Sequence, residues 1–436
     1  MQFVRYHSCR CALAQISRTR LTRSWTHSLA NPDEQMKLAF GLGERLILFP
    51  GGGHQGDGAT IAGVPKEILA GEKRVAVVPD MVKKTGVQLA VQQGAGVEAG
   101  YLDSEYAQNG ASIAPDSSSL YGQADVILKV QPPTEAEVGQ FREGATLISF
   151  VYPLGNLDLV EMLAARKITT FAMDLMPRIT RAQSMDALSS QATISGYRAV
   201  LLAAGSLPKL FPMLMTAAGT VSPAKVFVVG AGVAGLQAIA VSRRLGAVVE
   251  AYDVRPIAKE EVSSLGARFV ELPLESGEAA GAGGYAKAQS AEFYQKQQAL
   301  LAEHTHSSDV VITTALVFGK RAPVLISEEA VKGMRPGSVI VDLAAESGGN
   351  CALSEPGKTV VKYGVTIHAP LNVPSSMAPQ ASLFYSRNIT AFLIELVKAS
   401  TPSLNLKDEL IRGPLLTYNG EVTHQGTKDA IVGRKH

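Results

Sequence analysis

Three glycines carry the clearest chemistry in this sequence. Gly230, Gly232 and Gly235 form a GxGxxG loop, which follows the apolar run KVFVV and precedes the stretch LQAIAVSRRLGA. Between a predicted strand and a predicted helix, Gly230 allows a tight turn, Gly232 lets the main chain approach a pyrophosphate, and Gly235 lets the helix pack closely on the strand. The free N–H groups and the positive dipole end of the helix then hold phosphates. The pattern predicts a dinucleotide site, against the alternative of an ordinary βαβ unit whose glycines serve only a turn.

The kind of dinucleotide depends on Asp253, which lies eighteen positions after Gly235 at the end of the run VVEAYD. A carboxylate at this distance accepts hydrogen bonds from a ribose 2′-hydroxyl and repels a 2′-phosphate. The sequence therefore predicts NAD(H), rather than NADP(H), as the cofactor.

A second polar segment, residues 177–192, reads PRITRAQSMDALSSQA. Arg178 and Asp186 have charges that suit an ion pair, and Gln183 and Ser189 have groups that suit an amide. Such a loop can hold the carboxamide of a nicotinamide and orient the ring, which hydride transfer needs more than it needs an acid or a base. The alternative is a solvated loop that ends in a helix N-cap.

The elements that would position these segments alternate between strands and helices. Helical patterns are expected at 79–85 and 103–109, and a long helix is expected over ALSSQATISGYRAVLLAA, residues 187–204. This alternation predicts a parallel sheet with helices on both faces. The expected strands lie in IAGVPKE, KRVAVVP, VQLAVQQGAG, ADVILKVQ, ATLISFVYP, TTFAMDL, KVFVV, VVEAYD, ARFVELP, DVVITTAL, SVIVDLA and KYGVTIHA.

Two domains are expected from the length of 436 residues and from this order of elements. Residues 61–187 and 378–436 would form the first, because the helix at 389–398 is expected to return to it, and residues 188–377 would form the second. The predicted fold class is α/β, with two Rossmann-like domains whose parallel sheets flank a cleft and are linked by long helices.

Composition limits the other possibilities. The chain has 41 basic and 39 acidic side chains, so nothing suggests nucleic acid as a partner. Residues 1–32 contain five arginines and no acid, a composition typical of an organelle transit peptide, although a disordered basic tail is the alternative. No role is evident for residues 33–60. The apolar stretch 199–220 is interrupted by Pro208, Lys209 and Pro212, so no membrane span is predicted.

Histidines and cysteines offer little further chemistry. Cys351 lacks a histidine near it in the sequence, so a buried structural thiol is expected, and no metal site or disulfide framework is indicated. His304 and His306 are expected in a solvated loop between a helix and a strand, and His368 is expected to be a core residue.

Several motifs together resemble one family. They are VPKE…KRVA, LKVQPP, PRITRAQSMDALSSQA, GAGVAGLQA, GGYAK, TTALVFGKRAPVLI, GSVIVDLAAESGGNC and PSSMAPQASLFYSRNI. From about residue 61 to about residue 421, the chain resembles the NAD(H)-binding component of proton-translocating NAD(P) transhydrogenase and, more distantly, alanine dehydrogenase. The RAQSMDALSS block is typical of the transhydrogenase branch.

The resemblance implies roles for individual residues. Arg178, Gln183, Asp186 and Ser189 resemble the residues on the nicotinamide side of the family site, and Gln183 is expected to reach toward the nucleotide of the partner. The segment 275–285 is expected to be a lid. The further cofactor contacts that the resemblance implies are Ser184, Met185, Val233, Asp253, Val254, Arg255, Gly284, Gln297 and Leu316.

The resemblance also implies an activity and partners. Hydride is expected to pass directly from NADH on this chain to NADP⁺ on another component. A single dinucleotide fingerprint and no membrane span imply that NADP(H) binding and proton translocation belong to partner polypeptides, one of them membrane-spanning. A homodimer is implied as well. With the arginine-rich leader, the expected location is the matrix side of the mitochondrial inner membrane.

Two alternative functions remain. In an alanine dehydrogenase, Lys129 and Arg74 would match two of the residues around the keto acid, but the family histidine is replaced by Tyr152, and Glu346 stands where that family has aspartate. Without the histidine no general acid is evident for protonating a carbonyl oxygen. The other alternative is a non-enzymatic NAD-binding protein.

Overall fold

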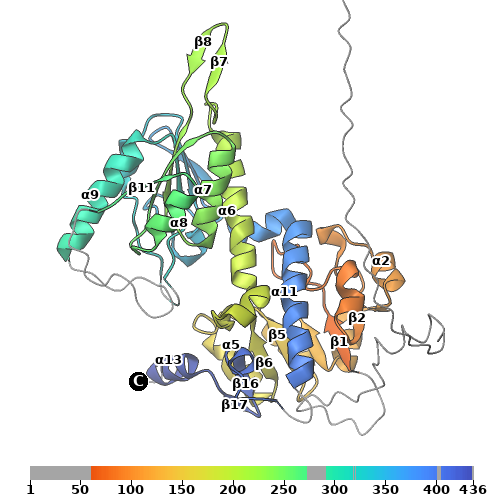
Figure 1. The fold of residues 1–436 in the computed structure, drawn as a ribbon. Helices are drawn as coiled ribbons and strands as arrows, with labels where there is room; N and C mark the ends of the chain where they lie inside the picture. Colours follow the sequence, from red (N-terminus) through yellow and green to blue (C-terminus); the bar gives the residue numbers. More distant parts are fainter. Residues whose placement is uncertain (1–59, 273–290, 318, 320, 400–403, 435–436) are drawn as a thin grey trace, which may run out of the picture. The chain divides into compact units, whose positions relative to one another are not determined.

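The protein is built around two sheets with helices on their faces (Figure 1). The computed structural model describes residues 60–272, 291–317, 319, 321–399 and 404–434. In each sheet six parallel strands follow the spatial order 3-2-1-4-5-6, counted along the chain. This is the order of doubly wound folds, in which ligands bind at the carboxyl ends of the strands where the winding reverses. The α/β prediction is confirmed.

The first sheet reverses its winding at β1 (Ile61–Val64), which pairs in parallel with β2 (Gln88–Gln92) on one side and β4 (Val126–Leu128) on the other. Two late strands extend this sheet by antiparallel pairing. The remaining strands are β3 (Ser112–Ala114), β5 (Thr146–Ser149), β6 (Thr169–Ala172), β16 (Leu415–Tyr418) and β17 (Glu421–Val422). Its helical segments include η1 (Pro79–Lys84), η2 (Val97–Ala99), α2 (Asp103–Gln108), α3 (Ser117–Gln123), α4 (Glu135–Gln140), α5 (Leu157–Ala165), η3 (Met173–Leu175) and η4 (Thr180–Met185).

The second sheet reverses at β9 (Lys225–Val229), between β10 (Val248–Tyr252) and β12 (Val310–Thr313). The glycine loop leaves the carboxyl end of β9 and enters α7 (Val233–Arg244), so it lies at the switch point. The remaining elements are β11 (Arg268–Phe269), β13 (Val339–Asp342), β14 (Thr359–Lys362), β15 (Val365–His368), α8 (Ala258–Ser264), α9 (Ala291–Ser307), α10 (Glu328–Lys332) and η6 (Ala345–Ser347).

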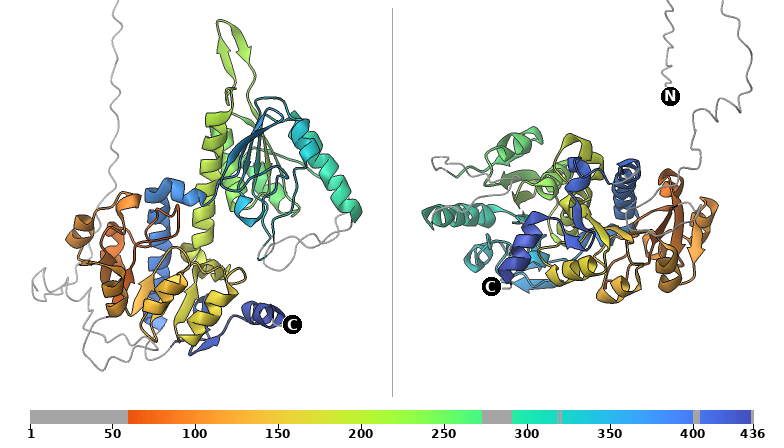
Figure 2. Two further views of the ribbon diagram at one scale, coloured as in Figure 1. Left: turned by 180° about the vertical axis from the view of Figure 1, so that it is seen from behind. Right: turned by 90° about the horizontal axis from the view of Figure 1, so that it is seen from below.

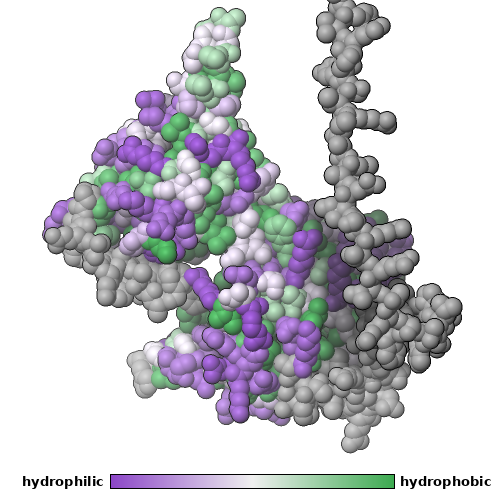
Figure 3. Space-filling view, viewed as in Figure 1, coloured by the Kyte–Doolittle hydropathy of each residue, from purple (hydrophilic) through white to green (hydrophobic). Residues whose placement is uncertain are grey.

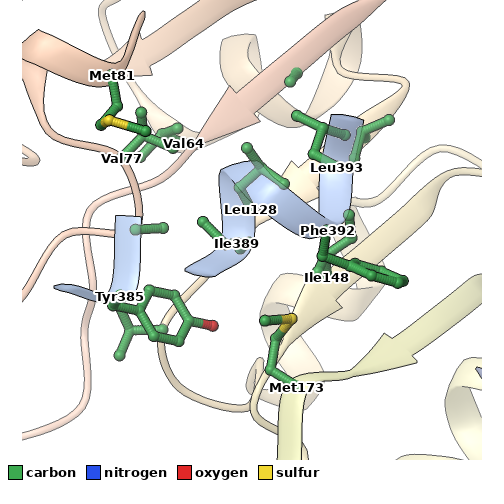
Figure 4. Packing of buried hydrophobic residues seen from close by; sticks show 14 of the residues in the cluster. Val64, Val77, Met81, Leu128, Ile148, Met173, Tyr385, Ile389, Phe392 and Leu393 are labelled. Carbon is green, nitrogen blue, oxygen red and sulfur yellow. The ribbon is translucent and has the colours of Figure 1, made fainter. Parts of the chain in front are cut away.

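Two long helices connect these parts. The expected helix after residue 186 is α6 (Ala187–Ser206), which contacts both α7 and α11 (Ala378–Ala399). The expected helix at 389–398 is the second half of α11, and η7 (Val373–Met377) precedes it. Ile389, Phe392 and Leu393 of α11 pack against Val64, Leu128 and other residues of the first sheet (Figure 4). The prediction that the late helix returns to the first sheet is therefore confirmed.

One expected strand is wrong. The segment KRVAVVP is buried except for Lys73 but forms no strand. Its N–H groups are bound by serine side chains instead: Lys73 donates to Ser375 (2.7 Å), Val75 to Ser382 (3.0 Å) and Val78 to Ser386 (3.1 Å). Because α11 and the turn before it satisfy these donors, the segment keeps its β-like pattern without joining the sheet.

Three histidines and one hairpin also differ from the sequence predictions. His304 and His306 lie in the last turn of α9, not in a loop, and His304 bonds Glu250 at 2.6 Å. His368 is half-buried between the hydroxyls of Ser206 and Thr359. Neither strand of the hairpin β7 (Leu214–Thr216) and β8 (Gly219–Val221) was expected, since they bury nothing in this chain (Figure 2).

The expected domain boundaries fall at the first residues of α6 and α11, and both the boundaries and the cleft stay predictions. The leader at 1–59 and the lid at 275–285 lie outside the described residues. Within the described part of the chain, no helix is both long and apolar enough to span a bilayer.

The serine contacts of α11 predict a stability difference. Replacing Ser382 with alanine leaves the buried N–H of Val75 without its acceptor, so the free energy of unfolding should fall by about 1–3 kcal/mol. Ser242 on α7 is also fully buried, and its hydroxyl has no hydrogen-bond partner within the described ranges. Ser242→Ala is therefore the matched control, with little loss expected in urea unfolding. Equal losses in the two variants would contradict this explanation.

Candidate functional site

Two of the three loop glycines lie so close to other atoms that a side chain would not fit. Gly230 has φ of 99°, which a side chain rarely tolerates, and a Cβ atom there would lie 2.7 Å from Thr314 Oγ1. A Cβ atom at Gly235 would lie 1.8 Å from the Gly230 carbonyl oxygen. The turn and the close packing of α7 on β9 thus require glycine at both positions, as the sequence predicts.

Gly232 differs from its neighbours because a Cβ atom added there would meet nothing within 4 Å. It is the N-cap of α7, and no side chain caps the first N–H groups of this helix. The first N–H groups and the positive end of the dipole lie at this terminus of the helix. Of the three loop glycines, Gly232 is therefore the one with free space beside its main chain.

Both carboxylate oxygens of Asp253 accept hydrogen bonds from other groups of this chain. Its Oδ2 accepts from the Ala231 N–H (2.8 Å) and from Arg255 Nη2 (2.9 Å), and its Oδ1 accepts from the main-chain N–H (2.8 Å) and Nε (2.9 Å) of Arg255. The hydrogen bonds that Arg255 donates to Asp253 raise the pKa of the guanidinium. A carboxylate has about four acceptor positions, so a ribose hydroxyl must compete with Arg255 for this group.

A buried polar network holds the neighbouring loop against Gly230. The Thr314 hydroxyl donates to the Gly230 carbonyl (2.9 Å), and the side chain of Asn350 bonds both the N–H and the carbonyl of Ala315 (2.9 Å each). The main-chain N–H of Asn350 in turn donates to Asp342. This fully buried carboxylate accepts five hydrogen bonds. Sequence reasoning missed this network, because its members lie far apart in the chain.

The second site segment is the short 3₁₀ helix η4 followed by the start of α6. Asp186 is the N-cap of α6, and its carboxylate accepts the N–H (2.9 Å) and the hydroxyl (2.6 Å) of Ser189. Arg178, Gln183 and Ser184 are exposed. The structure thus shows an exposed polar segment that ends in the expected helix N-cap. The proposed ion pair of Arg178 with Asp186 stays a prediction.

Helix α6 links the two segments. It begins at the Asp186 cap, and ten residues later Gly196 touches the first turn of α7. A Cβ atom at Gly196 would lie 2.1 Å from the Ala234 carbonyl oxygen. The sequence shows Gly196 as a glycine inside a helical pattern, and such a residue signals a close packing contact, but its partner is visible only in the structure.

The remaining predicted cofactor contacts differ in accessibility. Val233 and Leu316 are exposed, at 43% and 51%, and Val254 is half-buried. Met185 is 4% exposed and packs in the core, so only its main chain can reach a ligand. Gln297 is 3% exposed and donates to the Tyr252 hydroxyl at 2.9 Å, so its amide is turned inward. Gly284 lies outside the described residues.

The two cations that would match an alanine dehydrogenase are both paired. Lys129 is 1% exposed and bonds Glu137 (2.7 Å) and Glu67 (3.2 Å). Burial would lower the pKa of Lys129, but the two carboxylates hold it above its ordinary value. Arg74 forms a bidentate ion pair with Glu72. Burial alone would raise the pKa of Glu72, but the hydrogen bonds and charge of Arg74 lower it to about 2.

Tyr152 replaces the histidine expected of a dehydrogenase. It has φ of 49°, an uncommon conformation for an aromatic residue, and the Asp174 carboxylate supports it by accepting the N–H groups of Val151 (2.8 Å) and Tyr152 (3.1 Å). Although Tyr152 is 43% exposed, partial desolvation and the nearby Asp174 raise the pKa of the phenol above its ordinary value. Tyr152 is therefore a poor proton donor at neutral pH.

Cys351 is buried, as expected, at 3% exposed, and burial raises the pKa of its thiol to about 11. It is therefore a structural thiol rather than a nucleophile. Within the described ranges no group of three or more His, Cys, Asp or Glu side chains is placed to hold a metal ion.

Together the switch-point loop and the strand order define a protein of two Rossmann-type α/β domains. The chain belongs to the alanine dehydrogenase/PNT family: the model of the C-terminal domain of that family matches residues 199–425, and the model of its N-terminal domain matches residues 63–195.

Within the family, this chain is more similar to a transhydrogenase subunit than to an alanine dehydrogenase. The chain is 50% identical over 372 residues to an NAD(P) transhydrogenase subunit alpha chain of Rhodospirillum rubrum, covering 83% of this chain and 97% of that one. It is 27% identical over 382 residues to an alanine dehydrogenase of Methanococcus maripaludis, covering 85% and 96%.

Solved structures agree with this fold. A transhydrogenase structure from Sinorhizobium meliloti is 47% identical, with a TM-score of 0.74 and coverage of 83% of this chain and 99% of that one. An L-alanine dehydrogenase structure is 24% identical, with a TM-score of 0.70 and coverage of 86% and 99%, and shares the fold.

The glycine contacts predict opposite results for two similar substitutions. Gly235→Ala places a methyl group against the Gly230 carbonyl and should lower the free energy of unfolding by about 3 kcal/mol. Gly232→Ala meets open space, and the smaller N-cap preference of alanine should cost at most about 1 kcal/mol. Chemical unfolding of both variants measures the difference. Comparable losses would show that the loop is not packed as described.

Proposed function

We propose that this chain is the NAD(H)-binding component of a proton-translocating NAD(P) transhydrogenase. Hydride passes directly between C4 of a nicotinamide held here and C4 of NADP⁺ held by a partner component. The observation that carries the cofactor assignment is the glycine loop, where Gly230 and Gly235 are locked and Gly232 faces open space at a helix N-terminus. The acceptor is inferred from the much greater similarity to transhydrogenase alpha subunits than to alanine dehydrogenases.

In this proposal NAD(H) fits the residues present without a metal ion. Gly232 and Val233 at the start of α7 would hold the pyrophosphate, because the helix N-terminus supplies N–H groups. Asp253 binds the adenosine ribose once Arg255 releases some of its hold on the carboxylate, while the Ala231 N–H keeps it oriented. Val254, Leu316, Gly284 and Gln297 complete the proposed contacts, and Gln297 would have to turn from Tyr252 or act indirectly.

The nicotinamide end lies, in the proposal, at the segment from Arg178 to Ser189. Gln183 is exposed there and reaches toward the partner nucleotide, while the main chain of Ser184 and Met185 borders the ring. Asp186 and Ser189 cap α6 and so fix where this segment begins its helix. These groups orient the ring; the nicotinamide supplies the hydride chemistry.

The alternative of amino-acid oxidation is disfavoured by charge and by acid–base chemistry. Arg74 and Lys129 already have carboxylate partners from this chain, so neither offers an unpaired cation to a keto acid. The residue in place of the family histidine is Tyr152, whose raised pKa makes proton transfer to a carbonyl oxygen slow.

Partner components belong to the proposal. The bacterial relatives from Rhodospirillum rubrum and Cereibacter sphaeroides are described as subunit alpha of a transhydrogenase, which implies further subunits. NADP(H) binding and proton translocation are therefore assigned to other components, one of which spans the membrane. The mitochondrial matrix location is proposed from the arginine-rich residues 1–32 alone, while these two relatives are from bacteria.

A homodimer is proposed, with the hairpin β7–β8 as its contact. All six strand residues of the hairpin are exposed, and apolar surface gathers along it (Figure 3). Met213 is 59% exposed and Met215 is 82% exposed. An exposed two-stranded hairpin is marginally stable alone, so a second copy of this chain is the occupant that would bury it.

The assignment predicts hydride exchange without an amino acid. The purified protein, mixed with NADH, a thionicotinamide analogue of NADP⁺ and an NADP-binding partner component, should reduce the analogue, as followed by its absorbance. Omitting the partner is the control and should abolish the reaction. No exchange, together with alanine-dependent reduction of NAD⁺, would establish the dehydrogenase instead. NAD(H) affinity with neither activity would favour a non-enzymatic protein.

The dimer contact predicts a change in self-association. Met215→Asp places a charge on the hairpin and should raise the dimer dissociation constant at least about tenfold, equivalent to about 1.4 kcal/mol. Val361→Asp is the matched control, since Val361 is 66% exposed on the edge strand β14. Sedimentation of both variants measures the dimer fraction. Unchanged association of Met215→Asp would exclude the hairpin as the contact.

A further inference from the structure

The segment that presents Gln183 is short and has little internal support. Element η4 covers only Thr180–Met185, and no side chain caps its N-terminus. The hydrogen bonds of a 3₁₀ helix are poorer than those of an α-helix. The position of this segment therefore depends on contacts from other elements, and helix α11 supplies them.

Asn388 on α11 makes a direct contact with this segment. Its Nδ2 donates to the main-chain carbonyl oxygen of Ser184 at 2.8 Å. Asn388 is 5% exposed, and its Oδ1 has no hydrogen-bond partner among the described residues. The buried amide of Asn388 has this one side-chain hydrogen bond among the described residues, so it holds the Ser184 carbonyl in place, because a shift would leave the amide unpaired.

Helix α11, which carries Asn388, is itself anchored by several contacts. Ser382 and Ser386, on the preceding turns, accept the main-chain N–H groups of Val75 and Val78. On the same helix, Ile389 belongs to the core cluster that includes Ala182 and Met185 of η4. Asn388 therefore connects Ser184 to an element that is anchored on the first sheet.

A second contact on the segment is weaker. Arg181 is bidentate to Asp408, with distances of 3.2 Å and 3.1 Å, but the Arg181 side chain is 60% exposed. An ion pair so accessible to water contributes little to stability, and less in salt. Asn388 is the contact that solvent cannot replace.

We propose that Asn388 is a positioning residue for hydride transfer, acting through the Ser184 carbonyl on the exposed Gln183 and on the Asp186 cap. The proposal rests on the function assigned above. Hydride transfer depends steeply on the distance and angle between the reacting carbons, and a displacement of about 1 Å can cost about 100-fold. The glycine loop, which would bind most of NADH, has no hydrogen bond to the Asn388 side chain among the described residues.

Two variants and a matched control test this role. Asn388→Leu keeps a side chain of similar size and removes the N–H donor, and Asn388→Ser is smaller, so that it cannot overfill the site. Thr390→Val is the control. Thr390 lies two residues further along α11, is 1% exposed, and its hydroxyl has no hydrogen-bond partner in the described portion of the chain.

The measurement is single-turnover exchange between NADH and the thionicotinamide NADP⁺ analogue in the assembled complex with the partner components. Both Asn388 variants should lower the exchange rate at least tenfold, with the dissociation constant for NADH within twofold of wild type. Thr390→Val should match wild type in both. The same dissociation constant shows that a slowed variant is folded.

The outcomes separate the two proposals. If the wild-type complex exchanges no hydride, the proposed function is wrong. If wild type exchanges and both folded Asn388 variants exchange at the same rate, the positioning role is wrong. A parallel loss of rate and NADH affinity in Thr390→Val and the Asn388 variants would assign Asn388 a merely structural role and would likewise overturn the inference.

Discussion

The site depends on the close crossing of α6 and α7. At this crossing Gly196 lies so near the Ala234 carbonyl that no side chain fits between them. The first turn of α7 carries the loop proposed to bind phosphates, and the first residue of α6 follows the Asp186 cap. Ten residues of α-helix span about 15 Å, so this single contact links the two proposed ends of the cofactor through one continuous helix.

The chemistry of this arrangement is one of orientation. The buried cations Lys129 and Arg74 are neutralised by carboxylates of this chain, and Tyr152 is poorly suited to donate a proton. What remains accessible is an unobstructed main chain at Gly232 and a short polar segment that includes Gln183. A protein that only has to hold a nicotinamide at a set distance from another nucleotide needs these features and no general acid.

The sequence predicted what is decided locally. The glycine loop, its strand and its helix lie within about thirty residues of sequence, so spacing was sufficient to find them, and the Asp186 cap precedes its helix directly. Contacts between distant segments could not be found in this way. Asn388 lies 204 positions from Ser184, and Ser382 lies 307 from Val75. The strand predicted at KRVAVVP failed for the same reason, because serines of α11 bind its N–H groups.

The central claim is that hydride moves directly between two nicotinamides, and an isotope label tests it most simply. NADH carrying deuterium at C4, on the face that is transferred, is incubated with the assembled complex and NADP⁺ in ordinary water. Direct transfer predicts deuterium at C4 of the NADPH formed, with none lost to solvent, because no intermediate exchanges protons. Unlabelled NADPH, with the deuterium recovered in water, would contradict it.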